Sequence, residues 1–394
     1  MTALITDSLP LLAGAPNGIK KLRELILELA VRGKLVPQDP NDEPASELLK
    51  RIAEEKARLV AEGKIKRQKP LAEIDVEEKP FDLPSGWGWA RFGEIFSLEY
   101  GDNLPADKRS NTGEYPVYGS NGVVGTHNTY FVDSPCIVVG RKGSAGALNL
   151  CRSNGCCVTD VAYYCIPSSA LSIDYVFKLF HTLGLNFLGK GIKPGLNRNE
   201  AYELVIAIPS LTEQHRIVAK VDELMALCDR LEAQQADADS AHAQLVQALL
   251  NSLPQASDAD DFAQSWQRLA EHFHTLFTTE SSIDALKQTL LQLAVMGKLV
   301  PQDPSDEPAT ELLKRNGIDS EAHALQGWAQ APLGYLGEVL GGSTPSKTKA
   351  DFWNGDIPWV SPKDMKRPVI DDSIDQAVAG AECNTVIELT QEHH

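Results

Sequence analysis

The sequence predicts a mixed α/β fold (α+β), in which a compact domain is attached to long, antiparallel coiled-coil-like helices and a second domain of the same kind is incomplete. Three observations predict this. Short apolar segments alternate with glycine-rich turns between residues 81 and 210, a heptad pattern runs through residues 217–249, and a block of nineteen residues occurs twice.

Length and composition place the chain among globular proteins. Its 394 residues suggest two or three domains at about 150 residues each, and 43% hydrophobic with 23% charged residues is a globular composition. No apolar run approaches the ~20 residues that cross a bilayer, and the first ten residues lack the positive charge of a secretory signal. Seven cysteines, an odd number, favour reduced thiols in a cytoplasmic protein over a disulfide framework.

Charge is distributed unevenly along the chain. The net charge is −17, but residues 134–199 contain seven basic and two acidic side chains, whereas residues 200–284 contain four basic and fifteen acidic ones. The mean charge therefore does not exclude a nucleic-acid partner for the basic segment, and the acidic segment could face a basic protein.

A duplicated block organises the chain. Residues 33–51 and 297–315 are identical at seventeen of nineteen positions, with a constant offset of 264. This period is far longer than the ~20–50 residues of a solenoid repeat, so each unit must contain a whole domain with its connectors. Gene duplication without functional meaning is the alternative interpretation.

A weaker similarity follows each copy. Residues 112–118 and 354–360 both contain a small polar pair, an acid, a hydrophobic residue and proline. Only 68 residues remain from Gly327 onward, where the first copy needs 124, so we expect an incomplete second domain in a truncated chain. The predicted segments are an N-terminal helical extension with the first repeat copy (1–80), a first domain (81–210), a spacer helix (211–253), a linker (254–280), a second helical repeat copy (281–323) and an incomplete second domain (324–394).

The first domain is predicted to contain buried strands at residues 136–139, 161–165 and 204–208, and a helix over residues 173–183. Cys136 and Cys165 lie within apolar strands and are expected to be small core residues.

Residues 212–253 predict a long helix, with Thr212 as its cap and Glu213 in its first turn. About forty residues at ~1.5 Å each make a rod of roughly 60 Å. Its single apolar stripe needs a partner helix, for which residues 19–29 and 283–293 are candidates; an ordinary helix of a bundle is the alternative. The predicted seam consists of Ile217, Val221, Leu224, Leu231, Leu245 and Leu249, with Cys228 also in register and Gln235 and His242 as polar interruptions.

The sequence contains no motif for catalysis or cofactor binding. It has no Walker A sequence, dinucleotide fingerprint, adenine-methyltransferase Asn/Asp-Pro-Pro-Tyr/Phe motif, nucleophile elbow or His-Glu-x-x-His helix. The cysteines between residues 136 and 165 lack the paired spacing of a zinc site. We therefore predict no catalytic residue, no metal site and no cofactor of the chain's own.

Three motifs together resemble a known family. They are GKLVPQDP at residues 33–40 and 297–304, IPSLTEQHRIV at residues 208–218, and YPVYGSNG at residues 115–122. Over residues 19–361 the chain resembles the specificity (S) subunit of type I restriction–modification enzymes, with Ser210 where that family usually has proline.

The resemblance implies a non-catalytic DNA-recognition subunit. In that family two target-recognition domains each read half of a split DNA sequence, and long helices hold them apart and dock methylation subunits, which restriction subunits join. The implied partners are double-stranded DNA and these subunits, which would use S-adenosylmethionine, ATP and Mg. Helix length would then set the number of unread base pairs between half-sites. With its second domain incomplete, the chain could dimerise as a half-subunit or be a non-functional fragment.

Candidate DNA contacts lie on three loops of the first domain. Asn121 is suited to pair with adenine, Arg141 with guanine and Lys142 with phosphate. The structural alternatives are an Asn-Gly turn, a solvated hairpin and a charged surface loop. The predicted DNA-binding residues are Tyr118, Ser120, Asn121, Arg141, Lys142, Ser144, Lys190, Lys193, Asn197 and Arg198.

Two other functions remain open from the sequence. The acidic charge would suit a coiled-coil scaffold or adaptor that makes no DNA contact. A stand-alone enzyme is a weaker alternative, because its motifs are missing. Salt-dependent DNA binding would distinguish a DNA reader from a scaffold.

Overall fold

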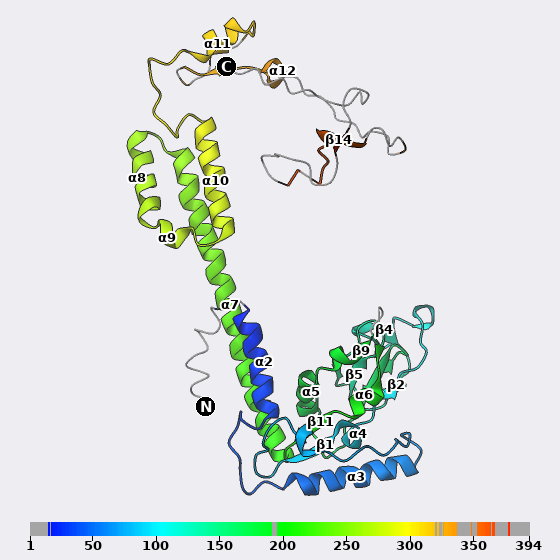
Figure 1. The fold of residues 1–394 in the computed structure, drawn as a ribbon. Coiled ribbons are helices and arrows are strands. Elements are labelled where there is room, and N and C mark those ends of the chain that lie inside the picture. The colour runs from blue at the N-terminus through cyan, green and yellow to red at the C-terminus, as the bar shows by residue number, and fades with distance from the viewer. Residues whose placement is uncertain are drawn as a thin grey trace. The chain divides into compact units, whose positions relative to one another are not determined.

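The computed structural model describes residues 15, 17–190, 195–319, 321–322, 325, 327–336, 348, 353–363, 365–366 and 377–378. The chain divides into two compact units, Met1–Leu245 and Val246–His394 (Figure 1). The predicted mixed α/β class is confirmed, because the first unit combines helices with small, mainly antiparallel sheets. Among the described helices, none has the length and apolar character that a membrane span requires.

The first unit is built from helices around small sheets. Its elements are α2 (Gly18–Val31), α3 (Ala45–Ala61), β1 (Gly88–Arg91), α4 (Phe92–Ile95), β2 (Glu99–Tyr100), β3 (Tyr115–Gly119), β4 (Gly122–His127), β5 (Cys136–Gly140), β6 (Leu148–Cys151), β7 (Cys157–Val158), β8 (Ala162–Cys165), α5 (Ile173–Thr182), β9 (Gly189–Lys190), β10 (Gly195–Leu196), α6 (Arg198–Tyr202), β11 (Val205–Ile208) and the first part of α7 (Leu211–Gln255). One sheet has strand order β2-β8-β5-β6, another has order β4-β3-β7, and β1 pairs with β11 as β9 does with β10. One hydrophobic core runs from α2 and α7 through α5 to β5 and β8.

The strands and the helix predicted within the first domain are present. β5, β8 and β11 coincide with the predicted apolar segments, and α5 coincides with the predicted helix. Cys136 and Cys165 are fully buried, as expected. Local apolar patterning therefore located the centre of this domain correctly.

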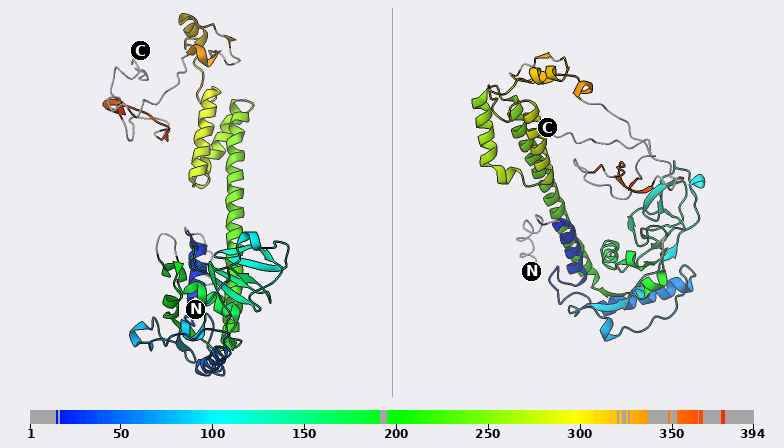
Figure 2. Two further views of the ribbon diagram at one scale, coloured as in Figure 1. Left: turned by 90° about the vertical axis from the view of Figure 1, so that its right-hand side faces the viewer. Right: turned by 45° about the horizontal axis from the view of Figure 1, so that its top comes forward.

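Helix α2 lies alongside the first part of α7 (Figures 1 and 2). Arg23 of α2 donates hydrogen bonds of 2.7 Å to both Asp229 and Glu232 of α7. The predicted pairing of residues 19–29 with the long helix is thus confirmed.

Ile26 is the most deeply placed of the α2 side chains, at 0% exposed. We expect Ile26→Ala to lower the free energy of unfolding by about 2–5 kcal/mol, since it leaves a cavity between helices. Leu25→Ala is the matched control: this neighbour on the same helix is 38% exposed, so its replacement should cost far less. Equal shifts of the urea midpoint for both variants would contradict the α2–α7 packing.

The cap of α7 is Ser210. Its hydroxyl accepts a hydrogen bond of 3.0 Å from the amide of Glu213. The prediction that Thr212 caps the helix is therefore wrong, because the helix already begins at Leu211.

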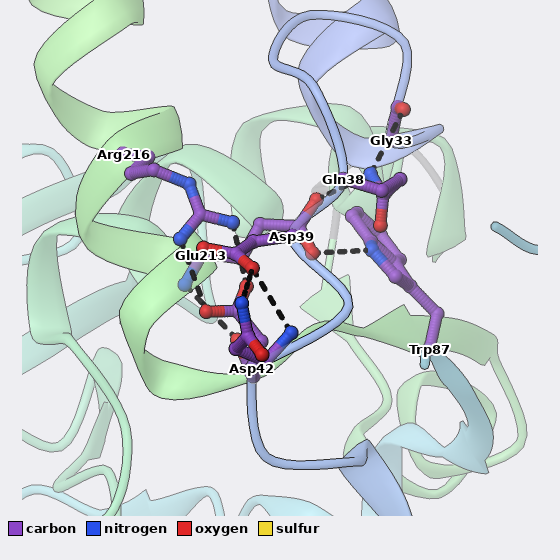
Figure 3. Close-up of polar contacts among 9 residues, drawn as sticks. Gly33, Gln38, Asp39, Asp42, Trp87, Glu213 and Arg216 are labelled. Carbon is purple, nitrogen blue, oxygen red and sulfur yellow. Dashed lines mark hydrogen bonds and ion pairs between the residues drawn. The ribbon is translucent and has the colours of Figure 1, made fainter. Parts of the chain in front are cut away.

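The first turn of α7 is also held by the first copy of the duplicated block (Figure 3). Glu213 is only 3% exposed, and its carboxylate accepts hydrogen bonds from the Gln38 amide at 2.7 Å and the Trp87 indole at 2.9 Å. Burial raises the pKa of Glu213, and these two donors oppose that rise. One turn later, Arg216 donates to both carboxylate oxygens of Asp42, at 2.6 and 3.1 Å. We call these five residues the helix clamp.

The Asp42–Arg216 pair makes the clamp sensitive to acid. Hydrogen bonds from Arg216 hold the pKa of Asp42 below its ordinary value. Stability from a depressed carboxyl pKa is present above the unfolded-state pKa of about 3.9 and is lost as the pH falls through the folded-state value. We expect Asp42→Asn to be less stable than wild type in urea at neutral pH, and the difference to shrink steadily below about pH 4. A pH-independent difference would contradict this assignment.

The predicted seam of α7 is confirmed in its first half and is wrong at Leu245 in its second half. The positions that lie in or against the core of the first unit are Ile217, Val221, Leu224, Cys228 and Leu231. Leu245, by contrast, is 52% exposed, whereas Leu249 is partly buried against the core of the second unit. The buried residues are instead Val246, Leu250 and Leu253. A seven-residue repeat drifts by about 20° per heptad around a straight α-helix, so after four heptads the buried position moves on by nearly one residue.

The second unit has its own core, built where the sequence predicted a linker. Its described elements are the last turns of α7, α8 (Ala259–Glu271), α9 (Phe273–Leu276), α10 (Glu280–Val295), α11 (Ala309–Arg315), β12 (Glu321–Ala322), β13 (Ala329–Gln330), α12 (Leu333–Leu336), β14 (Trp353–Pro358) and β15 (Ala377–Val378). Most of the predicted linker, residues 254–280, lies in α8 and α9, whose apolar residues pack with α10 and the end of α7. Asp258 caps α8 by accepting a hydrogen bond from the Asp261 amide, so this segment is a packed helical element.

The two copies of the duplicated block have the same local structure. Gly33 and Gly297 both adopt positive φ, +65° and +66°. Arg51 contacts Glu43 at 2.6 Å, and its counterpart Arg315 contacts Glu307 at 2.7 Å. Near-identical sequence therefore produces near-identical local geometry.

The burial of the two copies differs. Leu35 and Leu48 are 2% and 0% exposed, whereas their counterparts Leu299 and Leu312 are 42% and 48% exposed. Within the part of the chain that the structure describes, the second copy thus presents to solvent the apolar surface that the first copy buries.

Candidate nucleic-acid interface

Three loops predicted to contact DNA lie together at one end of the sheet domain. Lys142, in the loop after β5, forms a β-bridge with Gly195 of the β9–β10 hairpin. The amide of Ser144 donates a hydrogen bond of 3.2 Å to the hydroxyl of Ser120, in the β3–β4 turn. Figure 1 places β4 and β9 at the end of this domain away from α3. We call the surface formed by residues 120–121, 141–144 and 195–198 the loop face.

Gly140 allows two of these loops to approach each other. A Cβ atom at this position would lie 2.0 Å from the carbonyl oxygen of Ser144 and 2.4 Å from that of Ser120. Any side chain here would force the loops apart. Gly140, the last residue of β5 and the neighbour of Arg141, therefore has a packing role.

Two arginines of the loop face stack on one aromatic ring. The guanidinium carbon of Arg141 lies 4.8 Å from the ring centroid of Tyr100, and that of Arg198 lies 4.6 Å from the same centroid. Nη1 of Arg141 also donates to the carbonyl of Asp160 at 2.6 Å, and Nη1 of Arg198 donates to that of Leu98 at 2.9 Å. These contacts fix both guanidinium groups, since cation–π attraction and hydrogen bonding act together.

Tyr100 is a functional candidate that the sequence did not reveal. Its ring is 44% exposed and packs against Tyr163 with a centroid distance of 5.0 Å. It lies on a two-residue strand far from either arginine in the sequence, so no spacing pattern could have linked the three residues.

The predicted DNA-contact residues differ in how far they are exposed to solvent. Asn121, Lys142 and Asn197 are exposed, and Arg141 and Ser144 are half-buried. Tyr118 is only 9% exposed and packs beside Cys151 and Cys156, so it offers little side-chain surface for the predicted DNA contact. Successive side chains of β3 point to opposite faces, and here both faces are covered: Val117 packs with Cys157 in one cluster and Tyr118 packs in another.

Three of the predicted residues lie in or next to the β9–β10 hairpin. Asn197 caps α6, where its side chain accepts a hydrogen bond of 3.0 Å from the Asn199 amide. Lys190 belongs to β9, and Lys193 lies outside the described residues. One acidic side chain adjoins the loop face, because Asp160 lies 4.0 Å from the ammonium group of Lys142.

The sheet domain matches a known family. Residues 84–238 match the type I restriction modification DNA specificity domain. The chain carries a type I specificity domain. Both the loop face and the first turns of α7 lie inside the matched residues, so the specificity domain includes Glu213 and Arg216 of the helix clamp.

Curated relatives of the specificity domain extend the match over most of the chain. The chain is 45% identical over 327 residues to the specificity subunit of the type I restriction enzyme EcoAI of Escherichia coli, covering 76% of this chain and 55% of the relative. It is 45% identical over 333 residues to that of EcoEI of Escherichia coli, covering 76% and 54%. The resemblance inferred from the sequence motifs is thereby confirmed, and the chain spans about half the length of these relatives.

Solved structures similar to this chain include specificity subunits. The HsdS subunit from Thermoanaerobacter tengcongensis matches with a TM-score of 0.33 at 19% identity, covering 55% of this chain and 51% of that one. The S subunit from M. genitalium matches with a TM-score of 0.32 at 19% identity, covering 48% and 50%.

Proposed function

We propose that this chain recognises one half of a bipartite DNA sequence as a specificity subunit of a type I restriction–modification complex. It docks methylation and restriction subunits and carries out no chemical step itself. The observation that carries the proposal is the loop face, where three loops of the specificity domain gather amide, hydroxyl, ammonium and guanidinium donors on one exposed end. Such donors on loops suit base edges and phosphates.

The residues of the loop face divide into two roles. Arg141, held in place by Tyr100, and Asn121, at the tip of the β3–β4 turn, are assigned to base edges. Lys142, which is exposed and has a flexible side chain, is assigned to a phosphate. The cofactors of the complex, S-adenosylmethionine, ATP and Mg, belong in this proposal to the partner subunits.

The exposed middle of α7 is the proposed docking site for a partner subunit. Residues 232–241 are exposed and contain no basic residue; Asp237 and Asp239 lie here beside Glu232, which pairs with Arg23. This acidic segment would attract a basic protein surface.

DNA binding by the full chain, reconstituted with type I methylation subunits, tests the proposal. We expect sequence-selective binding whose affinity falls steeply with salt, because phosphate contacts release counterions. A reconstituted complex that binds no duplex at any salt concentration would favour the coiled-coil scaffold instead.

The uncovered apolar surface of the second copy supports self-association. Leu299 and Leu312 are 42% and 48% exposed and would be covered in a dimer of this chain, because exposed apolar side chains at an interface are removed from water on association. We expect light scattering to give the mass of two chains for the wild type. Leu312→Ser should lower the measured mass toward that of one chain. A single-chain mass at all accessible concentrations would contradict the dimer.

A further inference from the structure

Three cysteine side chains meet in a buried cluster that the proposed function does not use. Cys136 begins β5 and Cys151 ends β6, and the two residues face each other in the β5–β6 ladder. Cys156 joins them from a separate segment, which is bridged to Val132. The three Sγ atoms lie within 4.8 Å of one another, and all three residues are 0% exposed. Three backbone segments thus bring thiols to one point of the core.

The separation of the sulfur atoms fits a coordination site. The Sγ atoms of Cys136 and Cys156 are 3.8 Å apart. Tetrahedral thiolates at a Zn–S distance of ~2.3 Å have sulfur atoms about 3.8 Å apart, whereas a disulfide needs ~2.05 Å. Cys157, the sequence neighbour of Cys156, contacts Thr129 with its sulfur instead and packs in a different cluster. The convergence is therefore specific to three of the cysteines in this region.

Hydroxyl groups adjoin the three thiols in otherwise apolar surroundings. The hydroxyl oxygen of Ser153 lies 3.3 Å from Sγ of Cys151, and Tyr118 packs in the same cluster. The thiolate is the form of cysteine that binds metal.

We propose that Cys136, Cys151 and Cys156 bind one structural Zn²⁺ ion. Binding turns three thiols into thiolates and releases three protons, and a hydroxyl group or a water molecule fills the fourth position. The ion ties the paired ends of β5 and β6 to the segment that carries Cys156. It thereby anchors the strand that leads into Arg141 of the loop face.

The sequence predicted no metal site, because the three cysteines lie on separate segments rather than in a paired motif. Their ligand set exists only once β5 and β6 pair and residue 156 is bridged to residue 132. The zinc proposal is independent of DNA binding. The chain could lack zinc and still bind DNA, or hold zinc and fail to bind DNA.

Metal analysis of the full chain, purified under reducing conditions without chelators, tests the proposal. We expect close to one zinc ion per chain, released when a mercurial reagent modifies the thiols. Cobalt substitution should give the thiolate charge-transfer and visible bands of a tetrahedral site. Cys136→Ser and Cys156→Ser should each lose at least about tenfold in zinc affinity. Cys157→Ser is the matched control and should keep the ion.

Three results would overturn the site. The first is wild-type chain that holds less than about a tenth of an ion and gives no thiolate band with added Co²⁺. The second is a disulfide between two of the three cysteines in the freshly isolated protein. The third is equal zinc loss in Cys157→Ser and Cys136→Ser. Because the metal content and the cobalt spectrum are measured on wild type, the proposal remains falsifiable even if the serine variants do not fold.

Discussion

Replacing Trp87 with alanine is expected to lower the free energy of unfolding of the first unit by about 3–5 kcal/mol. The Trp87 side chain is 8% exposed, and its indole donates to the buried carboxylate of Glu213. The change leaves a cavity beside Gly33, which lies against the Trp87 ring. It also removes one of the two hydrogen-bond donors that compensate the buried carboxylate of Glu213 for its loss of water. Urea unfolding measures the change in the free energy of unfolding. Hydrogen exchange should show that backbone amides in the first turns of α7 lose protection.

The internal repeat supplies a matched control. Trp328 occupies the equivalent position in the second copy, where its indole donates to Gln302 at 2.9 Å rather than to a buried carboxylate. Trp328→Ala, measured in the unit that carries it, should therefore cost less than Trp87→Ala. Trp87→Phe, which keeps most of the packing, isolates the hydrogen bond to a charged group, for which we expect about 1.5–3 kcal/mol. Equal costs at Trp87 and Trp328 would refute the role of Glu213.

Arg141→Ala is expected to weaken specific DNA binding by about 1–3 kcal/mol and to relax the preference at one base position. The guanidinium is fixed by Tyr100 and by the carbonyl of Asp160, so a base contact made by it would be well oriented. Selection of bound duplexes from a random pool by the reconstituted full chain reads the base preference. Tyr100→Ala should reproduce part of the loss by freeing the arginine.

Lys142→Ala separates the two roles on the same loop. We expect it to weaken binding to all sequences alike and to lower the slope of log K against log salt by about 0.9. Lys190→Ala, in the neighbouring hairpin, should behave in the same way. A base-selective loss from either lysine change, or an unchanged preference in Arg141→Ala, would reverse the assigned roles.

The local elements were predictable because their signals are local. Apolar segments gave β5, β8 and β11, and helical spacing gave α2, α5 and the long helix. The seam of α7 failed at Leu245, because a heptad count assumes a strict 3.5-residue repeat. The sequence predicted Thr212 as the cap of α7, whereas the structure has Ser210, because the exact start of a helix depends on backbone geometry.

The candidate site was predictable only in part. Charge and turn residues pointed to Asn121, Arg141 and Lys142, but not to Tyr100, which the pairing of β2 with β8 brings to the arginines. Tyr118 was assigned to the surface because its motif is turn-like, whereas in the structure it packs in the cluster of Cys136, Cys151 and Cys156.

The sequence by itself determined the family, the duplicated block and the positions of the main strands and helices. These follow from residue identities and from apolar periodicity over a few turns or strands. Only the tertiary structure decided which loops share a face, which residue holds the first turn of α7 and which cysteines meet. Each of these depends on contacts between residues far apart in the chain, such as Trp87 with Glu213, and short-range patterns carry no information about such contacts.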